Sequence, residues 1–127
     1  MSSNDRPFFR GRIRSFVYAG RGIVQVFRCE PNAKVHLIAA CVVIAVAAVL
    51  EVSITDFALL SIAITFVFVT ETINTAIERL TDLACPDPHP LAAQAKDTSA
   101  GAVLLASIGA VVIGAIVFGP KPHVANH

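Results

Sequence analysis

Apolar side chains fill three long stretches of the chain, and polar side chains interrupt them mainly at their ends. We predict membrane-spanning helices over residues 35–52, 54–83 and 90–119. At about 1.5 Å per residue, stretches of this length cross most or all of a hydrocarbon layer about 30 Å thick. The last third of the second stretch is polar, so this helix is expected to reach the membrane edge.

Residues 6–29 interleave arginines with large apolar residues, in the manner of a helix with one basic and one apolar face. A helix of this kind lies in the plane of an anionic membrane surface. Gly11, Gly20 and Gly22 weaken the prediction that it is continuous, because glycine is a poor helix former.

The segment from Cys85 to Pro90 contains three prolines, which remove backbone donors and cannot sustain a helix. We predict a loop there, with Pro90 in the first position of the next helix. The link between the first two spans carries Glu51 and Asp56 but no Lys or Arg, in contrast to the basic N-terminal segment. By the positive-inside rule, the N-terminus and the proline loop face the cytoplasm.

Composition agrees with a membrane protein, because 55% of the 127 residues are hydrophobic and only 15% are charged. The net charge is +1, and seven of the ten Lys and Arg residues precede His36, which argues against a nucleic-acid partner. The three cysteines show no CxxC spacing, so neither a disulfide framework nor a zinc site is indicated. We therefore predict one all-α membrane domain over residues 1–127.

Three carboxylates and one amide recur at helical spacing in the second predicted span. At about 100° per residue, the last three of them project within about 60° of the first around the helix axis. One face of the helix therefore carries Glu71, Asn74, Glu78 and Asp82.

The depth of this acidic face follows from the helical rise. If the helix enters the membrane near Ile54, Glu71 lies about 26 Å along it and Asp82 about 42 Å. The face then runs from the inner edge of the hydrocarbon into the headgroup zone, where a lipid hydroxyl can meet ATP. Because a charge at the membrane centre costs about 2.5–3.5 kcal/mol, Glu71 is the strongest functional candidate. For Asp82 alone, a solvated helix end is the alternative interpretation.

Candidate ligands for magnesium and phosphate lie near this face. Magnesium often takes one or two carboxylates together with phosphate oxygens, which Glu30 and Glu78 provide if the fold brings them together. Lys96, beside Asp97 at the start of the third span, either neutralises phosphate charge or extends its ammonium toward the membrane surface. No GxxxxGK[ST] phosphate loop occurs, and His36 reads as an interfacial residue.

Residues 71–78, ETINTAIE, followed by Asp82, resemble the signature of the prokaryotic membrane diacylglycerol and undecaprenol kinases. The resemblance extends from about Ser15 to Lys121, and the signature motif is specific. It includes further short matches, namely Ser15-Phe16 with Tyr18, Glu30 with Asn32 and His36, His89-Pro90-Leu91, and Ala95-Lys96-Asp97 before Ala100-Gly101-Ala102-Val103.

This resemblance implies a surface helix and three transmembrane helices, assembled as a homotrimer in the bacterial cytoplasmic membrane. It implies that Glu71 is the general base that takes the proton of the lipid hydroxyl, and that Glu30 and Glu78 hold Mg²⁺. The residues implied to surround or support ATP are Tyr18, Asn74, Asp82, Asp87, His89, Lys96 and Asp97.

One position departs from the family pattern, which carries an arginine seven positions before the tyrosine matched by Tyr18. This chain has Gly11 there. The basic contact stays open among three neighbouring arginines, Arg10, Arg12 and Arg14. Residues 30–37 and 118–121 look more like the undecaprenol kinase branch, so undecaprenol is the expected substrate and diacylglycerol the alternative.

Two functions of other classes stay open from the residues alone. Acidic residues inside a membrane also mark proton and cation pathways, which would fit a small transporter, although the acids here cluster at one membrane edge. A non-catalytic adaptor that binds anionic lipid through residues 6–29 would not depend on Glu71 or Glu78.

Overall fold

The computed structural model describes residues 6–120, with side chains from Phe9 onward. The described residues form four helices, α1 (Arg6–Cys29), α2 (Pro31–Val49), α3 (Ile54–Ala84) and α4 (Pro90–Phe118). No strand occurs within residues 6–120, so the predicted all-α class is confirmed. Lys121, where the family resemblance ends, lies outside the described residues.

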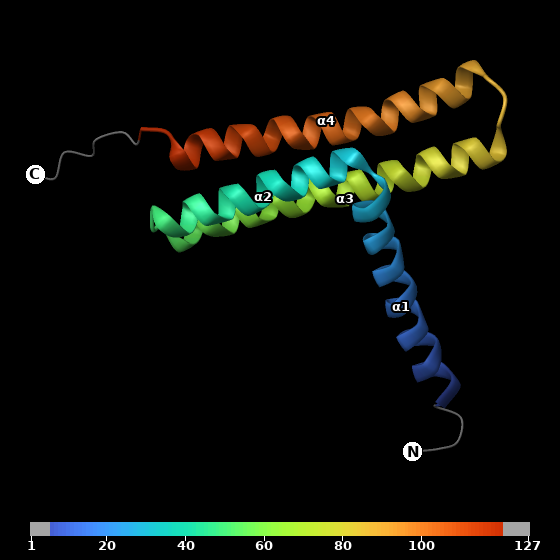
Figure 1. The fold of residues 1–127 in the computed structure, drawn as a ribbon, viewed down its shortest axis with the longest axis horizontal. Helices are drawn as coiled ribbons and strands as arrows, with labels where there is room; N and C mark the ends of the chain where they lie inside the picture. Colours follow the sequence, from blue (N-terminus) through green and yellow to red (C-terminus); the bar gives the residue numbers. More distant parts are fainter. Residues whose placement is uncertain (1–5, 121–127) are drawn as a thin grey trace, which may run out of the picture.

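Helices α2, α3 and α4 form one elongated bundle, and α1 leaves it at a steep angle (Figure 1). Helix α3 packs along α4 and also contacts α2. Helix α1 is anchored near its C-terminal end, where Val26 is buried and the ring of Phe27 packs against Phe68 of α3, with centroids 5.3 Å apart. The junction between α1 and α2 is therefore held beside the middle of α3.

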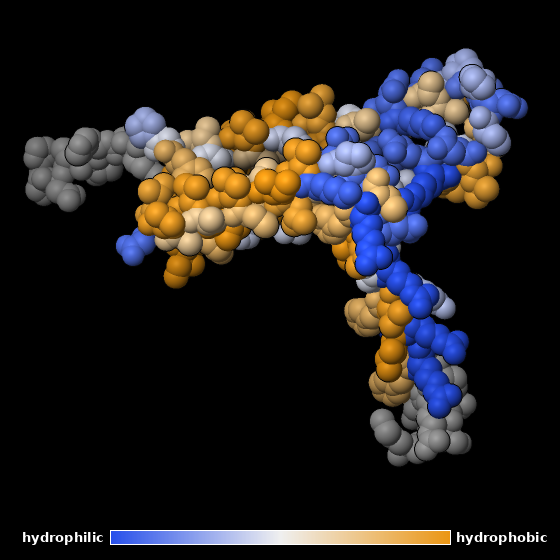
Figure 2. All heavy atoms as spheres, in the orientation of Figure 1, coloured by the Kyte–Doolittle hydropathy of each residue, from blue (hydrophilic) through white to orange (hydrophobic). Residues whose placement is uncertain are grey.

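Helix α1 continues through Gly11, Gly20 and Gly22 without a break. No other group approaches the Cβ position of these glycines, so each costs about 1 kcal/mol of helix propensity relative to alanine without leaving a packing defect. Hydrophilic residues line one side of α1 and apolar residues the other (Figure 2). The helix is amphipathic, as predicted; its position on a membrane surface stays a prediction.

Helix α2 differs from the predicted range 35–52 at both ends. It begins at Pro31, because proline has the fixed φ and missing donor that suit the first turn. It ends at Val49, because Glu51 adopts a φ of 50°, in the left-handed region that a right-handed helix cannot include. The four residues from Leu50 to Ser53 then turn the chain into α3.

Side chains cap the two long helices. Ser53 precedes α3, and its hydroxyl accepts a hydrogen bond from the backbone N–H of Asp56 at 3.1 Å. His89 precedes α4, and its Nδ1 accepts from the N–H of Leu91, also at 3.1 Å. Pro90 is the first residue of α4, and residues 85–89 are not helical, which confirms the predicted loop and helix start.

Three of the helices, α2, α3 and α4, are long and apolar enough to cross a membrane, as predicted. A small core of Ala47, Leu60 and Val117 joins them near the turn between α2 and α3. In their most apolar stretches, only 11%, 22% and 11% of the residues are buried within the chain. The remaining apolar surface faces outward, as on helices surrounded by lipid or by neighbouring helices.

The bundle has two chemically different ends (Figure 2). We call the part around Ala47, Leu60 and Val117 the apolar end. The polar end comprises residues 71–99 together with the junction between α1 and α2. Hydrophilic residues are concentrated there, around the proline loop and the C-terminal end of α1.

Candidate active site

Glu71 is the most buried charged residue of the polar end, with 2% of its surface exposed. It lies on α3, whose next turn is fixed locally by the Thr75 hydroxyl, which donates to the Glu71 carbonyl at 3.0 Å. The Oε2 atom of Glu71 is buried without a hydrogen-bond partner. The nearest ionisable partner is His36 of α2, whose Nε2 lies 3.6 Å from Oε2. Such an oxygen is ready to accept a proton or a donor group.

Asn74 and Glu78 continue the acidic face one and two turns beyond Glu71. The Nδ2 of Asn74 donates to Glu78 Oε1 at 3.4 Å, and the hydroxyl of Ser99 donates to Asn74 Oδ1 at 2.6 Å. Asn74 and Ser99 are both buried. The acidic face therefore packs against α4 at this level.

Glu30 occupies the single non-helical position between α1 and α2, and it makes no capping hydrogen bond with its side chain. Its Oε1 lies 4.0 Å from Arg79 Nη2 of α3. The negative charges of Glu30 and Glu78 both interact with the carboxylate of Glu71. Glu30 thus contacts α3 at Arg79, the residue after Glu78, and the joint role of Glu30 and Glu78 in holding magnesium stays a prediction.

Within residues 6–120, no three His, Cys, Asp or Glu side chains are arranged to hold a metal ion on their own. Magnesium bound to a nucleotide needs fewer protein ligands, because the phosphates supply several of its oxygens. Glu30 and Glu78, which come from different elements and whose charges both act on Glu71, would meet that requirement.

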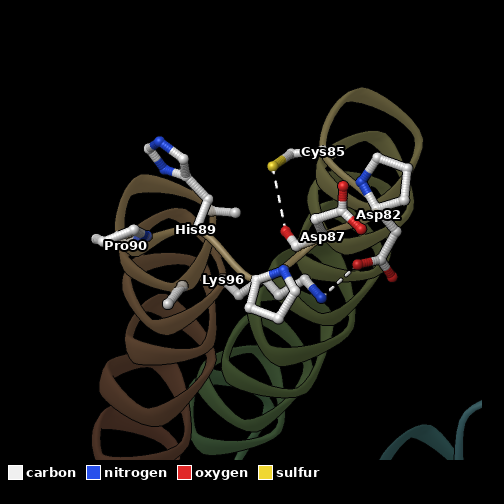
Figure 3. Close-up of a pocket in the computed structure, with 10 residues that line it drawn as sticks. Asp82, Cys85, Asp87, His89, Pro90 and Lys96 are labelled. Atoms are coloured by element: carbon white, nitrogen blue, oxygen red, sulfur yellow. Dashed lines mark hydrogen bonds and ion pairs between the residues drawn. The ribbon is translucent and has the colours of Figure 1, made fainter.

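A hollow of about 550 Å³ lies between the proline loop and the facing turns of α3 and α4 (Figure 3). Lys96 of α4 forms an ion pair across it with Asp82 of α3. The thiol of Cys85 donates to the carbonyl of Asp87 at 3.3 Å, which shapes the loop. The hollow is lined by one ammonium group, one imidazole and the carboxylates of Asp82 and Asp87. The ammonium can contact a phosphate directly, whereas the two carboxylates would need a cation between themselves and the phosphates.

The structure divides the seven residues predicted to surround ATP into three sets. Four of them line the hollow, namely Asp82, Asp87, His89 and Lys96. Asn74 lies deeper, beside Glu78. Tyr18 and Asp97 are exposed and do not line this hollow. The guanidinium of Arg21 lies 5.8 Å from the ring centre of Tyr18, within the range of a cation–π contact.

Three further residues join the site although sequence reasoning gave them no role in it. His36 was interpreted as an interfacial residue, and its signal was a polar side chain at the start of an apolar span. Arg79 directly follows Glu78, and nothing in the sequence indicates its contact with Glu30. Ser99 gave no signal, because it begins a run of small residues in α4.

The chain has clear relatives. The model of the family described as prokaryotic diacylglycerol kinase matches residues 17–118. An undecaprenol kinase of Bacillus subtilis (strain 168) is 42% identical over 108 residues, which cover 85% of this chain and 88% of the relative.

Two diacylglycerol kinases are also similar. That of Synechocystis sp. is 37% identical over 107 residues, which cover 84% of this chain and 61% of the relative. That of Escherichia coli (strain K12) is 29% identical over 117 residues, which cover 92% and 95% of the two chains. The matches include the whole of the polar end.

Proposed function

The chain belongs to the prokaryotic diacylglycerol kinase family and is a multi-pass bacterial membrane lipid kinase that uses ATP, and from this premise we propose that its lipid substrate is undecaprenol. The proposal is supported by the higher identity to an undecaprenol kinase, 42%, than to two diacylglycerol kinases, 37% and 29%. Residues 30–37 favour the same branch. Diacylglycerol is the second candidate, because two of these relatives are diacylglycerol kinases.

The buried Oε2 of Glu71, which accepts no hydrogen bond and lies 3.6 Å from Nε2 of His36, is the observation that carries the proposed mechanism. Glu71 lies where the apolar part of α3 gives way to its polar part. A lipid alcohol anchored in the membrane presents its hydroxyl at this level. The carboxylate takes the hydroxyl proton as a general base, a role that requires a proton acceptor within hydrogen-bond reach of the reacting oxygen.

A narrow apolar hollow of about 100 Å³ runs between α2 and α3 from His36 toward the apolar end. Apolar side chains line it, including Val43, Val67 and Phe68. We assign this hollow to the first part of the lipid chain, so that the hydroxyl group reaches Glu71 past His36, which is 28% exposed.

The transfer is a direct displacement. The lipid O–H bond breaks as its proton passes to Glu71, a bond forms between the lipid oxygen and the γ-phosphorus, and the bond to the bridging oxygen breaks to release ADP. Lys96 leaves its ion pair with Asp82 to contact the phosphates. Positioning and electrostatics supply most of the acceleration, and no phospho-enzyme is needed.

Glu30 and Glu78 are the residues that would hold magnesium, which neutralises charge on the transferring phosphoryl group when bound. Of the other residues assigned to ATP by resemblance, Asp87 and His89 act from the proline loop. Tyr18, which lies on α1, completes the site only if α1 or a neighbouring subunit moves toward the hollow. Asp97 supports the site from the position after Lys96 on α4.

The proposal includes the assembly and the orientation in the membrane. One domain over residues 1–127 forms a homotrimer in the cytoplasmic membrane, with α1 on the cytoplasmic surface and the polar end at the cytoplasmic edge of the membrane. The extensive exposed apolar surface of α2, α3 and α4 supports both lipid contact and contact between subunits. Family membership favours this enzyme over the transporter and adaptor interpretations.

The test is a competition between lipids. The purified chain in vesicles is incubated with γ-labelled ATP, magnesium and either undecaprenol or diacylglycerol. We expect labelled undecaprenyl phosphate to form with the higher kcat/KM. Faster labelling of diacylglycerol would transfer the assignment to that lipid, and no labelled lipid in either incubation would overturn the proposal.

A further inference from the structure

We propose that Ser99 is a positioning residue for the kinase reaction, acting through Asn74 on the carboxylate of Glu78. This inference rests on the proposed function, in which Glu78 holds the magnesium of ATP. Ser99 lies on α4, 25 residues from Asn74 along the chain. It does not line the hollow at the proline loop, and its hydrogen bonds go to Asn74 and Lys96 and not to Glu78.

The contact between Ser99 and Asn74 is short and buried. The two oxygen atoms lie 2.6 Å apart, and the two residues are only 7% and 9% exposed. A hydrogen bond shielded from water in this way is hard to replace, because a buried acceptor that loses its donor is left unsatisfied. It also joins α4 to α3 at the level of the acidic face.

The amide of Asn74 can present either its oxygen or its nitrogen to Glu78, since the two ends have nearly the same shape. If the oxygen faced Glu78, two acceptors would lie 3.4 Å apart, which is unfavourable while Glu78 is ionised. Ionised Glu78 therefore favours the orientation in which Nδ2 donates to Oε1. In that orientation Oδ1 turns toward α4 and requires a donor of its own.

The Ser99 hydroxyl supplies that donor, but it has a second acceptor. The carbonyl of Lys96, one turn back on α4, lies 3.0 Å from the same hydroxyl oxygen. One hydroxyl carries one proton, and the shorter distance is the one to Asn74. Ser99 thus connects the amide orientation on α3 to the turn of α4 that carries Lys96.

The consequence is a chain of two hydrogen bonds from Ser99 to Asn74 and from Asn74 to Glu78. It holds the Glu78 carboxylate in one position before the nucleotide binds. Without the hydroxyl, the amide is free to turn, and Glu78 loses a fixed donor. The expected defect concerns the binding of magnesium-ATP and leaves the binding of the lipid unchanged.

The test uses two variants and a control on the same helix. Ser99→Ala removes the hydroxyl, and Ser99→Cys replaces it by a thiol of similar shape that is a weak donor. Ser107→Ala removes a half-buried hydroxyl two turns further along α4, away from Asn74. We expect the KM for magnesium-ATP to rise about tenfold in both Ser99 variants, with an unchanged KM for the lipid. Ser107→Ala is expected to stay within about twofold of the unmodified chain.

If Ser99 acts through Asn74, substitutions at the two residues should not have additive effects on the KM for magnesium-ATP. A general loss of stability would not produce this pattern. Ser99→Ala is therefore combined with Asn74→Ala, and the double variant is expected to have the same KM for magnesium-ATP as Asn74→Ala alone. Ser99→Thr, which keeps the hydroxyl, is expected to restore a KM close to that of the unmodified chain. If the effects of Ser99→Ala and Asn74→Ala multiply, or if Ser99→Ala and Ser99→Cys both behave like Ser107→Ala, the inference is wrong.

Failure of this inference is distinguishable from failure of the proposed function. Glu78→Gln is measured in parallel. If Glu78→Gln keeps an unchanged magnesium dependence, the metal role of Glu78 is wrong and the inference falls with it. If Glu78→Gln is impaired and the Ser99 variants are not, only the role of Ser99 is overturned. If Ser99→Ala does not fold, Ser99→Cys decides the question, because it fills the same space.

Discussion

The two ends of the bundle hold their helices together in different ways. At the apolar end, Ala47, Leu60 and Val117 interlock by shape alone. At the polar end, α2, α3 and α4 are joined by specific polar contacts, including His36 with Glu71, Ser99 with Asn74, and Lys96 with Asp82.

The difference indicates that the apolar end stabilises the bundle and that the polar end carries the chemistry. Close packing between small and branched residues is sufficient in lipid, where apolar side chains gain nothing from leaving water. Buried polar groups are expensive unless they are paired, so their concentration at one end calls for a functional explanation. Substitutions at the apolar end are therefore expected to change stability, and those at the polar end to change turnover or nucleotide binding.

The largest effect is expected from Glu71→Gln at the polar end. The amide has nearly the shape of the carboxylate but cannot take the hydroxyl proton, so kcat is expected to fall about a thousandfold. Binding of a non-hydrolysable ATP analogue, measured by calorimetry in the same vesicles, is expected to change little. A kcat close to that of the unmodified chain would remove Glu71 as the base.

The next effect is expected from Glu78→Gln, which keeps the shape of a proposed magnesium ligand and removes its charge. Mutation of residues that only hydrogen-bond to metal ligands lowers metal affinity by about 10- to 100-fold. For a direct ligand we expect the magnesium concentration that gives half-maximal activity to rise by at least this factor. Titration of activity with magnesium at fixed ATP measures it. An unchanged titration curve would contradict the assignment.

At the apolar end, Leu60→Ala is expected to lower the free energy of unfolding by about 2 kcal/mol, because Leu60 is only 2% exposed and packs between α2 and α4. Val49→Ala, at a residue that is 81% exposed, serves as the control. Equilibrium unfolding in mixed micelles measures the loss. A changed KM for magnesium-ATP in the folded Leu60 variant would break the separation between the two ends.

The smallest effect is expected from Lys96→Gln, which removes the ammonium group that faces the hollow at the proline loop. Loss of a charged hydrogen bond to phosphate is expected to raise the KM for ATP about tenfold. Lys96→Arg keeps the charge and is expected to lose less. Equal KM values for all three chains would show that Lys96 only pairs with Asp82.

Much of the fold follows from residue patterns. The apolar stretches and the prolines after Cys85 indicate three spans and one loop, because length and missing donors constrain the backbone locally. The start of α2 at Pro31 and its end before Glu51 were missed, since helix ends depend on single backbone angles.

The candidate site, like the fold, is only partly predictable from the sequence. The acidic face of α3 is predictable because helical spacing alone places Glu71 and Glu78 on one side. The contacts of Ser99 with Asn74 and of His36 with Glu71 are not, because they depend on how α4 and α2 pack against α3. A serine among small residues has no pattern that distinguishes a positioning hydroxyl from a packing residue.

The central claim is that the metal and phosphates of ATP bind at the polar end, beside Glu71. It is tested most directly by replacing magnesium with paramagnetic Mn²⁺, together with a non-hydrolysable ATP analogue, and recording NMR signals along the labelled chain. The account predicts strong broadening of signals from His36, Glu78 and Lys96 and sharp signals from Leu60 and Val117. Broadening centred on the apolar end, or equal at both ends, would contradict it.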